Sequence, residues 1–304
     1  MARVIIGPGA NSETVASIQQ ALAAAGVDPK GVDGGYGQNT TEAVKAFQQS
    51  RGLAATGAVD DATWQALMNR PIPPTDVRSL ELTAAFEGHG YSLAVGNFDG
   101  AWLTWGIVGF TMKHGEVQKI VLAIRDQNPQ LVADAFGDKA AELIAIMSAS
   151  PAEQQAWANT RTSNGQLVEP WRTGFKWFGS FPAVQAEQRR LAAEDYFTPA
   201  VATAKAMGIA SELGLALCFD VHVQNGGIKP AARAQIRQAG IPPGDERSLR
   251  RLIANAVADG ASAKYREDVR ARKLCIAEGQ GRVHGHDYVL ESWGLGESPA
   301  AELR

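Results

Sequence analysis

Two carboxylates stand in a stretch with few other charges, TAAFEGHGYSLAVGNFDGAWLTWGIVGFT, which covers residues 83–111. Glu87 falls at the end of a predicted helix, where the helix dipole is negative and aromatic neighbours exclude water. Both features disfavour the ionised form of the side chain, which suits a general acid. Asp99 lies in the polar turn NFDGAW, where a carboxylate is expected to stay ionised. An acid and a base in such different surroundings are typical of glycosidic-bond hydrolysis.

Each carboxylate also has a simpler explanation when it is taken alone. Glu87 would then be an exposed carboxylate at a helix end, and Asp99 would be a residue that forms a turn. Because a helix, an acid and a hairpin follow one another here, we favour the catalytic interpretation over these two separate explanations.

The elements around the two carboxylates follow from the same part of the sequence. TDVRSLELTAAFE predicts a helix that Thr75 or Asp76 caps and that Gly88 and Gly90 end. YSLAVGNFDGAWLTWGIVGFT is rich in strand-forming residues and contains an Asp-Gly step, which predicts a β-hairpin. Helical patterns follow to the C-terminus. The longest apolar run, Leu213–Val223, predicts a buried helix that is too short to span a membrane.

The chain of 304 residues is long enough for two domains. Three prolines between Asn69 and Asp76 mark their boundary, because proline disfavours helix at its own position and at the one before it. We expect a small three-helix domain over residues 1–70, a linker over 71–76 and a larger domain over 77–304. The fold is expected to be mainly α, with a small β-hairpin or sheet at the active site.

Composition excludes several classes of function. The chain has 29 Lys and Arg against 32 Asp and Glu, which argues against a nucleic-acid binder that relies on positive charge. Cys218 and Cys275 make no disulfide framework and are interpreted as buried thiols. His284 and His286 lack a nearby third ligand for a metal. We therefore expect no metal and no other cofactor.

The first 70 residues carry a long, ordered motif. IQQALAAAG, VDGGYGQNTTEAVKAFQQSRGL and TGAVDDATWQAL follow one another, with apolar residues at helical spacing. Thr40 or Thr41 and Asp60 or Asp61 are the candidate helix caps. The series closely resembles the peptidoglycan-binding domain at the ends of many bacterial and phage wall hydrolases. The resemblance implies a module that binds the polymer and does no chemistry.

The turn Asp33–Gly37 is the predicted contact surface of this module, with Asp33, Tyr36 and Gly37 as its residues. One aromatic ring beside amides suits the ring faces and hydroxyls of sugars. The alternative is that Tyr36 only packs the turn.

The stretch with the two carboxylates carries a second resemblance. Its Glu and the later DGAWLTWGIVGF look like the catalytic segment of lysozyme-like glycosidases, most closely the chitosanases of glycoside hydrolase family 46. EDYFTPAVATAKAMGIASELGLALCFDVHVQNGG and REDVRARKLC resemble later blocks of that family. The resemblance implies an α+β lysozyme-like fold and an inverting reaction. In it Glu87 protonates the leaving oxygen, Asp99 activates a water and Thr104 helps to hold that water, with roughly 6.5–9.5 Å between the two carboxyl groups.

The resemblance also indicates which residues contact or support the substrate. The predicted substrate-binding residues are Glu116, Tyr91, Trp105, Asn225, Arg272 and Asp220. Glu116 falls where the family has an acidic sugar-contacting residue, and Asn225 stands where the family has a His. Asp220 and Arg272 match positions that brace the acid or the cleft. The segment from Glu to Asp is shorter than in chitosanases, which weakens the expectation of chitosan as the substrate.

Charge and domain composition favour peptidoglycan as the substrate. Chitosan is polycationic and suits an acidic cleft, whereas Lys113, His114 and Lys119 lie near the carboxylates in sequence. A wall-binding module raises the local substrate concentration only if the enzyme attacks the same polymer. We therefore expect a monomeric muramidase that cuts β-1,4 bonds of peptidoglycan glycan strands and does not insert into membranes.

The N-terminus lacks the features of a secretory signal, which fits a phage endolysin made in the host cytoplasm. Such an enzyme acts in the periplasm or cell wall after release. A chitosanase, a secreted antibacterial muramidase effector and a non-catalytic wall-binding protein are the alternatives that the sequence leaves open.

Overall fold

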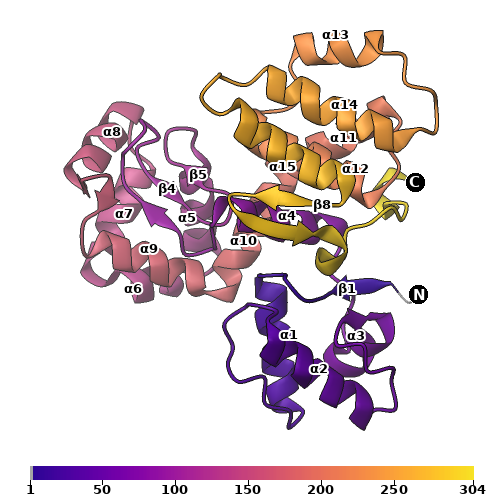
Figure 1. Ribbon diagram of the computed structural model, residues 1–304. Coiled ribbons are helices and arrows are strands. Elements are labelled where there is room, and N and C mark those ends of the chain that lie inside the picture. Colours follow the sequence, from indigo (N-terminus) through magenta and orange to yellow (C-terminus); the bar gives the residue numbers. More distant parts are fainter. Residues whose placement is uncertain (1–2) are drawn as a thin grey trace. The chain divides into compact units, whose positions relative to one another are not determined.

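The computed structural model describes residues 3–304, and the chain divides into two compact units. Unit 1 contains Met1–Phe86 and Tyr196–Arg304, and unit 2 contains Glu87–Asp195. The chain therefore passes from one unit to the other at the end of a helix and again near residue 195. Both units are mainly helical with small sheets, as the sequence predicts (Figure 1).

The first part of unit 1 holds the three predicted helices and a small two-stranded sheet. Its elements are β1 (Val4–Ile6), α1 (Glu13–Ala24), α2 (Gln38–Ser50), β2 (Val59–Asp60) and α3 (Asp61–Met68). The three-residue strand β1 pairs antiparallel with β2 and is too short to give a sequence signal.

The caps of these helices test the sequence predictions directly. Asp60 caps α3, since its side chain accepts a hydrogen bond from Thr63 N at 2.8 Å. The cap predicted at Thr40 or Thr41 is wrong, because α2 begins at Gln38 and Gly37 precedes it without a side-chain cap. The Thr41 hydroxyl instead donates to the Gly37 carbonyl inside the first turn at 2.9 Å.

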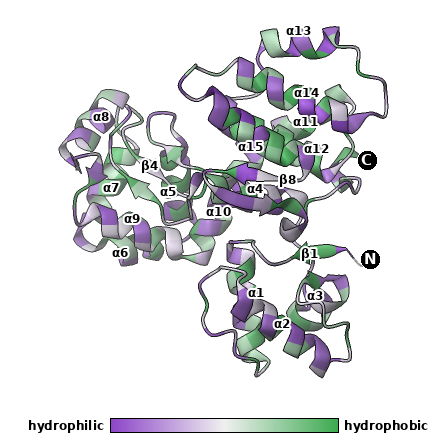
Figure 2. Cartoon of the chain, in the orientation of Figure 1, coloured by the Kyte–Doolittle hydropathy of each residue, from purple (hydrophilic) through white to green (hydrophobic). Residues whose placement is uncertain are grey.

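The remainder of unit 1 is a group of helices with one β-hairpin. The elements are α4 (Thr75–Glu87), α11 (Thr198–Met207), α12 (Glu212–Asn225), α13 (Pro230–Gln238), α14 (Glu246–Asp259), α15 (Arg266–Glu278), β8 (Gln280–Val283), β9 (His286–Val289) and the 3₁₀ turns Leu290–Trp293 and Ala301–Leu303. Helix α12 is buried from Glu212 to Val221 and packs against α11, α14 and α15, as its apolar run predicts. Figure 2 shows α14 and α15 alternating between hydrophobic and hydrophilic residues, which is the pattern of helices with one buried face.

Unit 2 combines a three-stranded antiparallel sheet with a group of helices. The elements are β3 (Ala94–Val95), β4 (Thr104–Trp105), β5 (Phe110–Thr111), α5 (Glu116–Gln127), α6 (Pro129–Phe136), the 3₁₀ turn Gly137–Lys139, α7 (Ala140–Met147), α8 (Pro151–Thr160), β6 (Thr162–Ser163), β7 (Gln166–Leu167), α9 (Trp171–Ser180), α10 (Pro182–Ala192) and the π-helical turn Ala193–Phe197 that joins α10 to α11. The predicted hairpin is present, but the Asp-Gly step lies inside the longer loop 96–103 and not in a two-residue turn.

No helix within residues 3–304 is both long and apolar enough to cross a lipid bilayer.

Candidate active site

Glu87 is the last residue of α4, and its side chain is partly exposed. Gly88 follows with φ 66°, a left-handed conformation that ends the helix there. The preceding turn is held in place from within unit 1. The Phe86 carbonyl lies 2.9 Å from His284 Nδ1, and the Phe86 ring lies under the Arg272 guanidinium at 5.4 Å. The position of Glu87 along α4 thus follows from contacts made one residue earlier.

Asp220 connects α4, α12 and α15 in the interior of unit 1. Its carboxylate accepts hydrogen bonds from the Thr83 hydroxyl of α4 at 2.9 Å and from Arg272 Nη2 at 2.7 Å, and it contacts Lys273 Nζ. Burial alone would raise the pKa of Asp220, but the charges of Arg272 and Lys273 outweigh burial and hold that pKa well below its ordinary value.

This ion cluster has no surface to offer to a substrate. Asp220, Arg272 and Lys273 are all 0 % exposed. The prediction that Asp220 and Arg272 bind substrate is therefore corrected to a supporting role, which is the bracing that the family resemblance also implied.

Asp99 lies in an exposed loop whose backbone is hydrogen-bonded to the Asn97 side chain. Its Oδ1 accepts a hydrogen bond from Ala101 N at 3.0 Å. Asn97 Oδ1 accepts from Gly100 N at 3.1 Å and from Trp102 N at 3.2 Å. Asn97 N donates to the Thr162 hydroxyl at 2.9 Å, which ties this loop to the β6–β7 hairpin. The Asp99 carboxylate therefore lies at the surface, and the backbone is hydrogen-bonded both before it, at Asn97, and after it, at Gly100 and Trp102.

Thr104 is a partly exposed residue of β4. It pairs with Val95 on β3 and with Thr111 on β5. A Cβ placed at Gly109 would lie 3.2 Å from the Thr104 methyl group and 3.3 Å from His89 Cε1. The Thr104 and His89 side chains therefore both lie close to Gly109, so the segment just after Glu87 and the predicted water-holding residue flank the same glycine.

Gln188 of α10 joins the same two segments from the buried side. Its Oε1 accepts a hydrogen bond from Ile107 N at 3.0 Å, and its Nε2 donates to the Tyr91 carbonyl at 3.1 Å. A side chain at Gly106, which has φ 87°, would collide with the Gln188 amide. Sequence reasoning missed Gln188, His89 and Asn97, because single polar residues far apart in the chain form no motif.

Two predicted substrate-binding aromatics are core residues. Trp105 is 0 % exposed, donates from Nε1 to the Phe175 carbonyl at 2.9 Å and stacks on Phe178. Tyr91 is 3 % exposed, and its hydroxyl accepts from Arg189 Nη1 at 3.1 Å. The predicted substrate contacts of both residues are wrong for this reason: their rings have no exposed face.

The two remaining predicted substrate contacts are Glu116 and Asn225. Glu116 is buried at the start of α5, where its Oε2 accepts from Thr111 N at 2.8 Å and from the Thr111 hydroxyl at 3.0 Å. It closes the turn after β5 and is only 8 % exposed, which leaves little surface for a sugar contact. Asn225 is the partly exposed last residue of α12, and its role as a contact stays a prediction.

The side chains of the predicted wall-contact turn, Asp33–Gly37, bond to other parts of the N-terminal module. Tyr36 is 2 % exposed and donates from its hydroxyl to the Gly57 carbonyl at 2.9 Å. Asp33 accepts from Gln19 Nε2 at 2.8 Å and from Gly35 N at 2.9 Å, and Gly37 precedes α2. Tyr36 therefore packs the turn, which is the alternative that the sequence left open.

Within the described chain, no group of three or more His, Cys, Asp or Glu side chains is arranged to hold a metal ion. His284 lies 2.6 Å from Asp268 Oδ1 through Nε2, so both of its ring nitrogens face hydrogen-bonding groups.

Comparison with protein families finds two matches. Residues 11–67 match the putative peptidoglycan binding domain, and residues 81–242 match glycosyl hydrolase family 46. A comparison with curated proteins finds no match.

Solved structures resemble the chain in fold. A native chitosanase from Bacillus subtilis MY002 is 19 % identical with a TM-score of 0.53, and the match covers 70 % of this chain and 96 % of that one. The family 46 chitosanase of Gynuella sunshinyii, in complex with chitotetraose, is 17 % identical with a TM-score of 0.50 over 73 % of this chain and 99 % of that one. At these identities the likeness concerns the fold, which is the mainly helical, lysozyme-like fold of this family.

The family 46 match spans more than half of the 304 residues and contains Glu87, Asp99 and Thr104. The match to the wall-binding domain lies entirely before it. The chain belongs to glycosyl hydrolase family 46 and is a glycosidase with a peptidoglycan-binding domain ahead of its catalytic domain.

Proposed function

We propose that this protein hydrolyses β-1,4 glycosidic bonds in the glycan strands of peptidoglycan, as a muramidase. The observation that carries the proposal is the presence of a peptidoglycan-binding domain and a family 46 hydrolase domain in one chain. A binding module raises the rate only on the polymer to which it holds the enzyme, because its contribution is an effective concentration. Chitosan would gain nothing from a module that binds peptidoglycan.

The chemistry is assigned to two carboxylates and one hydroxyl. Glu87, at the end of α4, protonates the leaving glycosidic oxygen as that bond breaks. Asp99 takes a proton from a water as the water attacks the anomeric carbon, and Thr104 orients that water. Asp99 is exposed, which supports its role as the base, because inversion requires a water between the base and the sugar.

The charge of unit 2 supports a substrate that is not a polycation. The unit contains twelve acidic and nine basic residues, which is a small excess. Several of its acids are also paired: Glu142 with Arg161, Glu169 with Arg172, Glu187 and Glu194 with Arg190, and Asp195 with Lys119. Polycationic chitosan would be attracted more strongly by unpaired carboxylates.

Chitosan hydrolysis is the second candidate, and the fold likeness favours it. The solved structures named above are chitosanases, and one of them holds chitotetraose. In that case the same Glu87 and Asp99 would act on β-1,4 bonds between glucosamine units, and the wall-binding domain would serve to locate the enzyme.

One experiment separates the two candidates. Purified full-length protein is incubated with insoluble peptidoglycan sacculi and, separately, with soluble chitosan, and new reducing ends are measured in both. The proposal expects release from sacculi that Glu87→Gln abolishes. Release from chitosan alone would replace the proposal with the second candidate, and release from neither would favour a non-catalytic wall-binding protein.

We also propose a biological role for the enzyme. A wall hydrolase of this architecture suits lysis of a bacterial cell, either as a phage endolysin or as a secreted antibacterial effector. Expression in a bacterial cytoplasm with and without a pore-forming holin tests the lytic role: lysis only when the holin is present would support it, and no lysis in either culture would reject it.

A further inference from the structure

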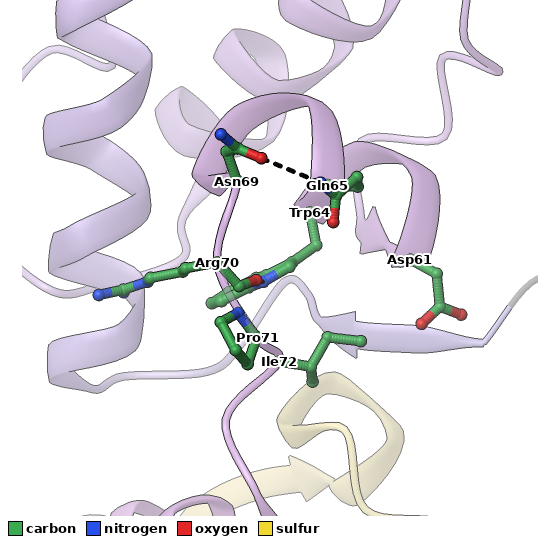
Figure 3. Close-up of a pocket in the computed structure, with 7 residues that line it drawn as sticks. All are labelled: Asp61, Trp64, Gln65, Asn69, Arg70, Pro71 and Ile72. Atoms are coloured by element: carbon green, nitrogen blue, oxygen red, sulfur yellow. Dashed lines mark hydrogen bonds between the residues drawn. The ribbon is translucent and has the colours of Figure 1, made fainter.

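The wall-binding domain has a pocket on the side of α3, where the chain leaves the domain. Its volume is ≈ 570 Å³, which is within the range of small-ligand sites. Figure 3 shows the residues that line it, which we call the α3 pocket: Asp61, Trp64, Gln65, Asn69, Arg70, Pro71 and Ile72. The last four lie beyond the segment that matches the domain family, so the end of the domain and the start of the linker complete the pocket.

The segment that follows α3, Asn69 and Arg70, is held against the helix in a defined conformation. Trp64 Nε1 donates to the Arg70 carbonyl at 2.7 Å, and the Arg70 guanidinium lies over the Trp64 ring at 5.6 Å. Asn69 has the left-handed φ of 46° and accepts a hydrogen bond from Gln65 Nε2 at 3.1 Å. The pocket is therefore formed before a ligand arrives, and binding does not have to order its wall.

The exposed groups of the pocket are of three chemical kinds. Gln65 and Asn69 present amides, Arg70 and Asp61 present opposite charges, and Pro71 and Ile72 add apolar surface. In Figure 3 the side chains of Arg70 and Asp61 extend toward opposite sides of the view, with the amide pair between them. Amides hydrogen-bond the N-acetyl group of a sugar, guanidinium pairs with a carboxylate, and apolar surface covers a sugar ring face.

We propose that the α3 pocket is where this domain binds peptidoglycan, and that its ligand is an N-acetylated sugar that carries a carboxylate. Arg70 pairs with the carboxylate, and Gln65 and Asn69 bond the acetamido group. The inference rests on the proposed function only for the identity of the polymer. It replaces the turn Asp33–Gly37, whose aromatic ring is buried and whose carboxylate is bonded to Gln19 and Gly35.

The test measures binding of full-length protein to insoluble sacculi on ice by co-sedimentation, and turnover of a soluble glycan substrate separately. Arg70→Ala and Gln65→Ala should each weaken binding roughly five- to tenfold, the usual effect of losing one polar contact. Turnover of the soluble substrate should not change, because neither residue belongs to the catalytic domain.

The domain offers a matched control for each variant. Arg51 is also exposed, follows a helix of the same domain and lies over an aromatic ring, that of Phe47, at 5.3 Å. Arg51→Ala thus removes the same charge and the same stacking outside the pocket. Gln49 is an exposed glutamine of α2 and is the control for Gln65. Thermal unfolding of all four variants verifies that the domain stays folded.

The outcomes separate the two proposals. Loss of binding in the pocket variants with wild-type binding in Arg51→Ala and Gln49→Ala supports the α3 pocket. Equal binding in all five proteins, or equal losses in Arg51→Ala and Arg70→Ala, overturns it. Failure of the wild type to sediment with sacculi also overturns it, while the hydrolysis assay still decides the proposed function by itself.

Discussion

Glu87 is the residue on which the proposed chemistry depends most. Glu87→Gln keeps the size and polarity of the side chain and removes the proton that a general acid must donate. We expect the rate of glycan hydrolysis to fall by about 10²–10⁴, with unchanged thermal unfolding and sacculus binding. Glu194→Gln, an exposed acid of the same unit that pairs with Arg190, is the control. A Glu87→Gln protein that hydrolyses at the wild-type rate would remove this residue from the mechanism.

Single residues also show where sequence reasoning succeeds. The cap at Asp60 and the buried run of α12 were predictable, because each depends on neighbours within a few residues. Glu87 and Asp99 were found by type and spacing, and the structure puts them at a helix end and in an exposed loop, as expected. The substrate contacts predicted for Trp105, Tyr91 and Glu116 are wrong, because a motif gives the position of a side chain in the sequence and not the direction in which it points.

At the scale of elements, Gln188 is the connection that sequence could not reveal. It bonds Tyr91 and Ile107 from a helix that is more than eighty residues away along the chain. Gln188→Ala leaves two buried backbone groups without this amide, which should cost about 2–4 kcal/mol of unfolding free energy. It should also lower kcat more than it raises KM, since the β4–β5 turn beside Thr104 loses its anchor.

The matched control is Gln185→Ala, a partly exposed glutamine on the same helix. Chemical denaturation measures the stability, and steady-state kinetics on a soluble substrate measure the activity. A Gln188→Ala protein with wild-type kcat at a temperature where it is fully folded would show that the amide serves stability alone.

The junction of α4, α12 and α15 depends on one carboxylate. Asp220→Asn removes the buried negative charge that Arg272 and Lys273 both contact, which should cost about 3–5 kcal/mol. Because the native pKa of Asp220 lies below its ordinary value of 3.8, its contribution is complete above that pH. The contribution is lost as the pH falls from there through the native pKa.

The measurement is the unfolding free energy of wild type and Asp220→Asn from neutral pH to pH 3. The difference between the two proteins should be largest at neutral pH and should shrink in acid. A difference that does not change with pH would contradict the assignment of the charge to this cluster.

At the scale of the whole molecule, the wall-binding domain is attached to α4 by more than the linker. Thr14 donates from its backbone N and its hydroxyl to Glu81 Oε1, at 3.0 and 2.8 Å. Burial raises the pKa of Glu81 above its ordinary 4.5. The native state therefore binds this proton more tightly than the unfolded chain, and stability falls as the pH rises from 4.5 through the native pKa.

Glu81→Gln keeps an oxygen that accepts from Thr14 and removes the buried charge. We expect the variant to unfold at the same temperature as wild type, or at a higher one, at neutral pH, and the two to converge below pH 4.5. Calorimetry across this range measures the effect. A variant that is several degrees less stable at neutral pH would show that the ionised carboxylate is the favoured form.

Domain content was predictable from sequence because both domains carry ordered motifs, and the two family matches agree with it. The pocket beside α3 was not predictable, because it is formed by a helix and by linker residues that have no motif. A pocket of this kind can be recognised only in the folded structure.

We propose that the carboxylates of this family 46 domain cut the glycan of peptidoglycan. Mass spectrometry of sacculi digested by the purified protein, after reduction of new chain ends, tests it most directly. The proposal predicts soluble disaccharide-peptide fragments with reduced N-acetylmuramic acid at the new ends, absent with Glu87→Gln. Intact sacculi beside chitosan cut to short oligomers would contradict it.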